Sequence, residues 1–297
     1  MAEAKTLGVI GGSGLYDLPD LSGVERVEVD TPFGPPSDAY VRGRLGEVTL
    51  VFLPRHGVGH RILPSELNAR ANIYGFKVLG VERILSISAV GSLREEIAPG
   101  DVVCVDQFLD RTRGRPSTFF GEGIAAHVAF GDPVCGQLHP VLVEAARAAC
   151  ERVHPRGTYV CMEGPAFSTR AESLFHRSLG ADVIGMTNLP EAKLAREAEI
   201  CYVTLALSTD YDAWREDEAA VSVDAVLEIL RANVERARET IRQLARRLPA
   251  ERCCACKDAL AHAIMTPAHL VPEATRARLA PIVGRYLEAE EHETSPG

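Results

Sequence analysis

Two aspartates at the end of an apolar run have the spacing that points most directly to chemistry. Asp210 and Asp212 follow the run Cys201–Leu207. On an extended chain they would point to the same side with their Cα atoms about 6–7 Å apart. Two carboxylates that close, beside an apolar sheet, would keep a proton available near neutral pH, as a general acid requires. An acidic turn that caps the next element explains the same spacing equally well.

A glycine-rich loop follows the first apolar run of the chain. In the stretch GVIGGSGL, residues 8–15, the dinucleotide fingerprint G-x-G-x-x-G fails in both registers, the G-x-S-x-G motif fails at Leu15, and no Walker lysine follows. The loop can still offer backbone N–H groups and the Ser13 hydroxyl to a small anion. The spacing fits a plain tight turn as well as it fits an anion site.

Arg55 and His56 come directly after another apolar run, at a place where α/β proteins often assemble their sites. A guanidinium group is suited to bidentate recognition of an oxyanion. His60 lies four residues beyond His56, but Gly57 and Gly59 argue against the helix that would turn both rings toward one metal ion. We therefore predict an oxyanion contact here and no metal.

The stretch from Glu163 to Thr169 places a carboxylate, an aromatic ring and two hydroxyls before a helical pattern. One explanation is a helix cap with a buried Phe167, and another is a loop in which Phe167 and Ser168 contact a ligand. Spacing alone favours the cap.

The eight cysteines fall into two groups. Five are scattered singly and are expected to be reduced, small buried hydrophobes: Cys104, Cys135, Cys150, Cys161 and Cys201. The other three, Cys253, Cys254 and Cys256, could bind a metal or form a disulfide, but no Cys or His pair near them in the sequence completes a zinc-like set. We interpret this CCAC cluster as a surface feature.

Alternating strand and helix patterns must position these residues. Strands are predicted at 7–10, 48–53, 84–90, 102–105, 158–162, 183–186 and 201–208, and helices at 65–79, 138–152, 169–179 and 191–197. Most of the strands do not alternate between apolar and polar residues, which indicates burial on both faces. The pattern predicts an α/β fold in which helices cover a central sheet.

The C-terminal part of the sequence is helical in pattern. A long helix is predicted from Ser222, its N-cap, and a further helix within 272–291 that is interrupted or kinked at Pro281. We divide the chain into an α/β domain, residues 1–250, and a helical extension, residues 251–297, that packs on this domain or on a neighbouring subunit.

The composition excludes several classes of protein. The 297 residues include 32 Lys and Arg against 41 Asp and Glu, a net charge of −9, so the overall field repels nucleic acid. With 46% hydrophobic and 25% charged residues the chain is an ordinary globular sequence. It contains neither a signal-peptide h-region nor an apolar stretch of about 20 residues. We expect a soluble, cytoplasmic protein that binds neither nucleic acid nor membrane.

Eight stretches together resemble the methylthioadenosine phosphorylase branch of the purine nucleoside phosphorylase family. In chain order they are GVIGGSGL, DTPFGPPSDA, RHGVGH, SAVGSLREEIAPGD, DQFLDRT, EGPAFSTRAE, MTNLPEAKLAREAEICY and STDYDAW, and they cover residues 7–245. The resemblance implies a single domain with a twisted, mostly parallel central sheet flanked by helices. It also implies a homotrimer whose active sites are completed by a neighbouring subunit.

The family reaction, by this resemblance, is the attack of phosphate on ribosyl C1′ of 5′-methylthioadenosine, which serves purine and methionine salvage. Phosphate is a co-substrate, and neither a metal nor an organic cofactor is implied. The implied phosphate contacts are Ser13, Arg55, His56, Ser88, Ala89 and Thr187. The implied substrate contacts are Met186 under the ribose, Phe167 and Ser168 beside the purine, Val223 at the 5′-alkylthio group, and His127 from a neighbouring subunit at the 5′ end.

The resemblance assigns the two aspartates to the purine base. We expect Asp210 to protonate N7 and Asp212 to accept a hydrogen bond from the 6-amino group. Family branches that act on 6-oxopurines usually have Asn at this position, because an amide can donate to O6, so the acidic pair favours a 6-aminopurine.

Two departures from the family pattern concern selectivity. Asn188 stands where the family often has Thr or Gly, and the chain after about residue 247 matches poorly. A segment around 259–264 is expected to close over the alkylthio pocket. The alternatives are a sister phosphorylase that prefers methylthioinosine or unmodified nucleosides, and a catalytically silent nucleoside-binding protein.

Overall fold

The computed structural model of the chain describes residues 5–12, 14, 15, 18–215 and 223–294. Within residues 223–230 and at 289–294 the description is largely confined to the backbone. Of the predicted site residues, Ser13 lies outside the described part, and for Val223, the first residue of helix α5, the side chain does.

Eleven described strands form one mixed sheet. Their bounds are β1 Thr6–Gly11, β2 Ser22–Val27, β3 Tyr40–Leu45, β4 Val48–Pro54, β5 Arg83–Ser92, β6 Val102–Val105, β7 Gln107–Arg111, β8 Val153–His154, β9 Thr158–Met162, β10 Val183–Gly185 and β11 Cys201–Asp210. Of the ten pairings among them, six are parallel. The sheet is therefore mostly parallel.

Strand β5 is the point at which the sheet branches. It runs parallel to β1 and to β11, and its last residues pair with β10 in the antiparallel sense. Because β1 is also parallel to β4, the carboxyl ends of β1, β4, β5 and β11 meet at one edge of the sheet. Loops at such an edge are where α/β proteins bind ligands.

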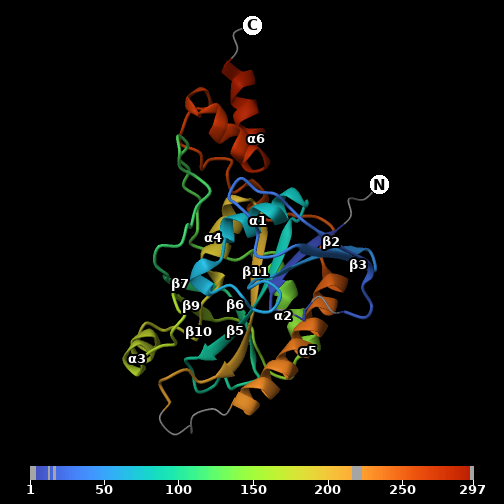
Figure 1. Cartoon of the computed structure of the whole chain (residues 1–297), viewed down its shortest axis with the longest axis vertical. Helices are drawn as coiled ribbons and strands as arrows, with labels where there is room; N and C mark the ends of the chain where they lie inside the picture. The colour runs from blue at the N-terminus through green and yellow to red at the C-terminus, as the bar shows by residue number, and fades with distance from the viewer. Residues whose placement is uncertain (1–4, 13, 16–17, 216–222, 295–297) are drawn as a thin grey trace.

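Helices cover both faces of the sheet (Figure 1). The α-helices are α1 Ala69–Val78, α2 Leu138–Ala149, α3 Arg170–Ser178, α4 Asn188–Glu197, α5 Val223–Arg247 and α6 Glu273–Thr294, with short 3₁₀ turns at Pro64–Glu66, Ala255–Asp258 and Ala268–Leu270. Helices α1, α4 and α6 pack in one apolar cluster, whereas α2 and α5 pack in another.

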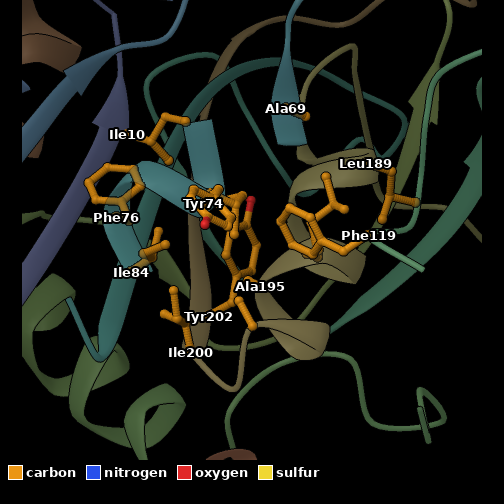
Figure 2. Packing of buried hydrophobic residues seen from close by; sticks show 14 of the residues in the cluster. Ile10, Ala69, Tyr74, Phe76, Ile84, Phe119, Leu189, Ala195, Ile200 and Tyr202 are labelled. Atoms are coloured by element: carbon orange, nitrogen blue, oxygen red, sulfur yellow. The ribbon is translucent and has the colours of Figure 1, made fainter. Parts of the chain in front are cut away.

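The two clusters use opposite faces of the same strands. In β4, Leu50 and Phe52 belong to the cluster with α2 and α5, whereas Val51 and Leu53 belong to the one with α1 and α4. Figure 2 shows the cluster with α1 and α4, in which rings such as Phe76 and Tyr202 fill the space between the sheet and the helices. Each fully buried side chain of this size contributes about 1.5–3 kcal/mol to stability.

The predicted elements compare closely with the observed ones. All seven predicted strands are present, and β2, β3, β7 and β8 were not predicted. The helix predicted at 65–79 instead begins at Ala69, because Asn68 caps it by accepting a hydrogen bond from Ala71 N. Helix α6 runs through Pro281 without interruption. The predicted N-cap Ser222 lies outside the described residues, and the domain boundary at residue 250 stays a prediction.

No helix in the described part of the chain is both long and apolar enough to cross a bilayer.

Candidate active site

Strand β5 opens to solvent at one residue near its carboxyl end. Ala89 is exposed although Ser88 and Val90 on either side are 4% and 2% exposed. The Ser88 hydroxyl lies 3.1 Å from the hydroxyl of Tyr159 and 3.2 Å from that of Thr187. This bare stretch of strand, with hydroxyls beside it, is accessible to a small ligand.

Thr187 reaches Ser88 from the turn that joins β10 to α4. Its side chain makes no capping hydrogen bond, and the extended Leu189, with φ of −116° and ψ of 133°, breaks the helical geometry two residues later. The Oγ1 of Thr187 is therefore available to Ser88 and to a ligand. Two neighbouring hydroxyl donors form an arrangement suited to an oxyanion.

Arg55 is buried, and its guanidinium group binds other protein groups. Its Nε and Nη2 form a buried ion pair with Glu191 of α4, with an Nε–Oε1 distance of 2.6 Å. Its Nη atoms also donate to the carbonyls of Ile10 and Ile87, the first at 3.2 Å and the second at 2.8 Å. Burial opposes its charge, but Glu191 outweighs it and raises the pKa of Arg55. The guanidinium group thus joins β1, β4, β5 and α4, and the predicted direct contact with phosphate stays a prediction.

Asn188 belongs to the same buried network. Its amide nitrogen donates to the hydroxyls of Ser86 and Tyr202 at 2.8 and 3.1 Å, and Tyr202 in turn donates to Glu191. Asn188, which departs from the family pattern, therefore belongs to the buried hydrogen-bond network around Glu191.

His56 follows Arg55 and is uncharged at neutral pH. Burial, mainly, lowers its pKa to about 4. Its Nδ1 lies 2.8 Å from the carbonyl of Ile62, so Nδ1 carries the proton and Nε2 keeps its lone pair. The ring stacks on His60 with a centroid distance of 4.3 Å, in a turn rather than a helix, as the two glycines predicted.

The two aspartates lie where β11 ends. The extended geometry expected for them is wrong, because the strand stops at Asp210 and Asp212 takes a left-handed conformation with φ of 50°. Asp212 N donates to Asp210 Oδ1 at 2.8 Å, and Thr209 donates to Asp210 Oδ2 at 2.7 Å. Such a turn is common for aspartate, whose side chain bonds to the following backbone.

Asp212 has one carboxylate oxygen without a partner. Its Oδ2 is buried and makes no hydrogen bond with any described residue. A buried, unpaired carboxylate oxygen is costly, and a hydrogen-bond donor from a ligand would remove that cost.

Gly91 places the acidic pair over β5. A Cβ atom at Gly91 would lie 3.1 Å from Asp210 Oδ1 and 3.2 Å from Asp212 Cβ, so the strand and the aspartates are in close contact there. Gly91 is three residues beyond Ser88, which corresponds to about 10 Å along a strand. The site thus has hydroxyl donors at one end, carboxylates at the other and exposed backbone between them.

Met186 and the loop before α3 form another wall. A Cβ at Gly164 would meet the sulfur of Met186 at 2.5 Å, which shows how closely the loop approaches Met186. Arg115 holds both: it donates to the carbonyls of Met186 and Glu163 at 2.7 and 2.6 Å and pairs with the Glu163 carboxylate. The sequence analysis missed Arg115, because a lone arginine in an irregular segment gives no spacing signal.

The predicted cap before α3 is confirmed in part. Thr169 is the N-cap and forms a reciprocal capping box with Glu172. Phe167, expected to be buried by that cap, is 83% exposed in the single chain, whereas Ser168 is buried. The Phe167 ring is therefore not part of the hydrophobic core of one chain.

Ala126 and His127 form a short strip, called the His127 strip below, that meets the C-terminal extension. Its backbone N donates to the carbonyl of Ala263 at 2.8 Å, and Ala126 pairs with Ile264 in an isolated bridge. The segment 259–264 therefore packs on the His127 strip. In the single chain, the His127 side chain is exposed.

A separate hollow of about 210 Å³ lies elsewhere on the sheet. It is lined by residues such as Asp106, Thr158 and Asp182, at the amino ends of β9 and β10. None of the predicted site residues lines it, and we assign the reaction site to the opposite ends of these strands.

Comparisons with known proteins agree with this architecture. Residues 6–248 match the family model described as the phosphorylase superfamily. The S-methyl-5′-thioadenosine phosphorylase of Geobacter sulfurreducens is 57% identical over 95% of this chain and 99% of its own. A methylthioadenosine phosphorylase from an Antarctic soil metagenomic library has a TM-score of 0.91, with 48% identity over 94% of this chain and 99% of that one.

A third relative was solved with a nucleoside bound. It is a mutant adenosine/methylthioadenosine phosphorylase from Schistosoma mansoni in complex with methylthioadenosine, with a TM-score of 0.78 and 38% identity over 94% of this chain and 98% of that one. Sequence and fold thus agree over nearly the whole length, and the chain belongs to the phosphorylase superfamily, within the family of S-methyl-5′-thioadenosine phosphorylases.

Proposed function

We propose that this protein cleaves S-methyl-5′-thioadenosine by phosphorolysis, giving adenine and 5-methylthioribose 1-phosphate. The observation that most supports this function is the arrangement along β5, where Ser88 and Thr187 hydroxyls and the free Asp212 oxygen flank the exposed Ala89. The identity of 57% with a phosphorylase of that name supports the same substrate.

The phosphate end of the site supplies donors without a metal. Ser88, Thr187 and the backbone beside Ala89 would hold phosphate in the turn before α4, and the buried Arg55–Glu191 pair would fix this turn against the sheet. Because these groups are fixed by the fold, a phosphate oxygen is placed in line with C1′ at little further cost in entropy.

The base end removes the leaving group. A phosphate oxygen forms the new bond to C1′ as the C1′–N9 bond breaks, and the bond's electron pair goes to the purine ring, which takes up a proton at N7. We assign that proton to Asp210 and the 6-amino group to the unpaired Oδ2 of Asp212. General acid assistance of this kind contributes about 10²–10⁴ in rate.

A product assay tests the reaction. Purified protein is incubated with 5′-methylthioadenosine with and without phosphate, beside 5′-methylthioinosine and adenosine, and purine release is followed by chromatography. We expect adenine only when phosphate is present, and fastest from methylthioadenosine. Preference for methylthioinosine would overturn the assignment of Asp212, and no turnover of any substrate would favour a silent nucleoside-binding protein.

Unmodified adenosine is the second candidate substrate. The Schistosoma relative is an adenosine/methylthioadenosine phosphorylase. A ratio of kcat/KM near one for the two substrates would favour adenosine as an equal substrate.

We also propose that the working form is a trimer in the cytoplasm, acting in purine and methionine salvage. The exposed Phe167 and the exposed His127 support a site that a neighbouring subunit completes. Light scattering on a size-exclusion column should then give about three times the 32.1 kDa of one chain. A mass of one chain together with full activity would contradict the shared site.

A further inference from the structure

Four cysteines that are far apart in the sequence meet at one place in the fold. Cys135, Cys201, Cys254 and Cys256 have Sγ atoms that all lie within 4.8 Å of one another. Cys135, Cys201 and Cys256 are buried, and Cys254 is half-buried. The earlier interpretation of the CCAC cluster as a surface feature holds only for Cys253, which is exposed; it is wrong for Cys254 and Cys256.

The four thiols come from three parts of the framework. Cys201 is the first residue of β11, and Cys135 lies three positions before the first residue of α2. Cys254 caps the 3₁₀ turn after α5, and Cys256 lies within it. All four lie in or against the apolar cluster of α2 and α5. The expected zinc-like pairing is absent from the sequence because the second pair, Cys135 and Cys201, is separated by 66 positions.

We propose that these four thiols bind one structural Zn²⁺ ion. In a tetrahedral tetrathiolate site with Zn–S bonds of about 2.3 Å, the sulfurs lie about 3.8 Å apart. The observed Sγ atoms all lie within 4.8 Å of one another, and Cys201 and Cys254 are 3.3 Å apart, so side-chain shifts of about 1 Å or less bring them to this spacing. This inference does not depend on the proposed reaction.

The surroundings of the sulfurs suit thiolates. The backbone N of Leu138 donates to Cys135 Sγ at 3.4 Å, at the N-terminus of α2. The Arg252 guanidinium interacts with Cys201. Backbone N–H groups and a nearby cation offset the negative charge of four thiolates around Zn²⁺.

A bound ion would fasten the C-terminal extension to the α/β domain. Residues 251–253 are already joined to Gln137 by hydrogen bonds, and Leu260 N donates to Glu199. Farther along, Ala263 and Ile264 pair with the His127 strip. Because the metal would close long loops in the chain, its binding free energy would add to the stability of the folded state.

Zinc content and thiol count test the proposal on the whole protein. The chain is purified without added metal or chelator, and zinc and iron are measured by inductively coupled plasma mass spectrometry. In parallel, thiols are counted in denaturant with chelator and without reductant. We expect about one zinc per chain and all eight thiols free. Six thiols without zinc would show a disulfide and overturn the proposal, as would eight thiols in a protein that takes up no added Zn²⁺, or iron in place of zinc.

Variants and cobalt locate the ion. Cys256→Ser should lose the stoichiometric zinc, whereas Cys253→Ser, the matched change three residues away at an exposed position, should keep it. Should Cys256→Ser not fold, the wild-type protein reconstituted with Co²⁺ gives the second readout: intense thiolate-to-cobalt bands and tetrahedral d–d bands are expected. Octahedral cobalt spectra, or loss of zinc from Cys253→Ser to the same extent, would contradict the assignment.

Discussion

Asp212 differs from Asp210 in how its carboxylate oxygens are used. Both oxygens of Asp210 accept hydrogen bonds from the chain, whereas Oδ2 of Asp212 is buried without a described partner. The place of both residues at the end of a strand could be predicted from the sequence. The unpaired oxygen could not, since it results from the left-handed turn at Asp212.

Amide variants separate the two roles. Asp210→Asn removes the acid, and we expect kcat for methylthioadenosine to fall by about 10²–10⁴. Asp212→Asn offers an N–H to the base, so the ratio of kcat/KM for methylthioinosine to methylthioadenosine should rise by about 10-fold or more. Steady-state kinetics on both substrates measures this, with Asp106→Asn, far from the site, as control. An unchanged kcat in Asp210→Asn would remove Asp210 from the mechanism.

Arg115 is a positioning residue for the ribose side of the site. Its planar fork binds the carbonyls of Met186 and Glu163 together, which the ammonium of a lysine cannot reproduce. We expect Arg115→Lys to lower kcat/KM by about 10–100-fold, mostly through KM, because Met186 and the loop at Gly164 shift. Arg113→Lys, two residues away and without a side-chain bond to Met186, is the control. Equal losses in the two variants would argue against the positioning role.

The elements that the sequence predicted are those with a strong apolar pattern. β1, β4, β5 and β11 are mostly buried and rich in apolar residues. β2 is mostly exposed and β7 carries polar residues, so neither has a periodic signal. Their strand state follows from pairing with β3 and β9, a tertiary effect that a local pattern does not contain.

The joint between the sheet and α4 is the buried Arg55–Glu191 pair. Removing one partner leaves the other charge buried, so Glu191→Gln should lower the free energy of unfolding by about 3–5 kcal/mol. Urea denaturation followed by circular dichroism measures it. Glu235→Gln, which breaks the exposed pair with Arg238, should cost less than about 1 kcal/mol. A loss that small for Glu191→Gln would mean that the pair does not join these elements.

At the scale of the molecule, the scattered cysteines show where sequence reasoning ends. Zinc motifs are recognised by close spacing, whereas here the fold brings together residues 135, 201, 254 and 256. The family resemblance predicts site residues on β5 and after β11 because its motifs are local, and this assignment stays a prediction. Contacts between distant segments, such as the cysteine cluster and the His127 strip, follow only from the packing of the extension on the domain.

The pH dependence of stability is a property of the whole chain that two buried groups shape in opposite ways. Burial raises the pKa of Glu197 to about 7, above its ordinary 4.5, despite hydrogen bonds from Phe119 N and the Thr118 hydroxyl. The folded state then holds a proton that the unfolded state has lost, so this contribution is complete below pH 4.5 and is lost as pH rises to about 7. His56, with its pKa lowered to about 4, instead loses stability as pH falls from 6.5 to 4.

Glu197→Gln isolates the first of these terms. An amide does not ionise, so the free energy of unfolding of the variant relative to wild type should rise between pH 4.5 and 8, by on the order of 3 kcal/mol. Urea denaturation at several pH values measures the difference, and Glu144→Gln, at an exposed position on α2, should leave the slope unchanged. A flat difference for Glu197→Gln would mean that Glu197 is ionised throughout this range and that its burial is fully compensated by Thr118 and Phe119.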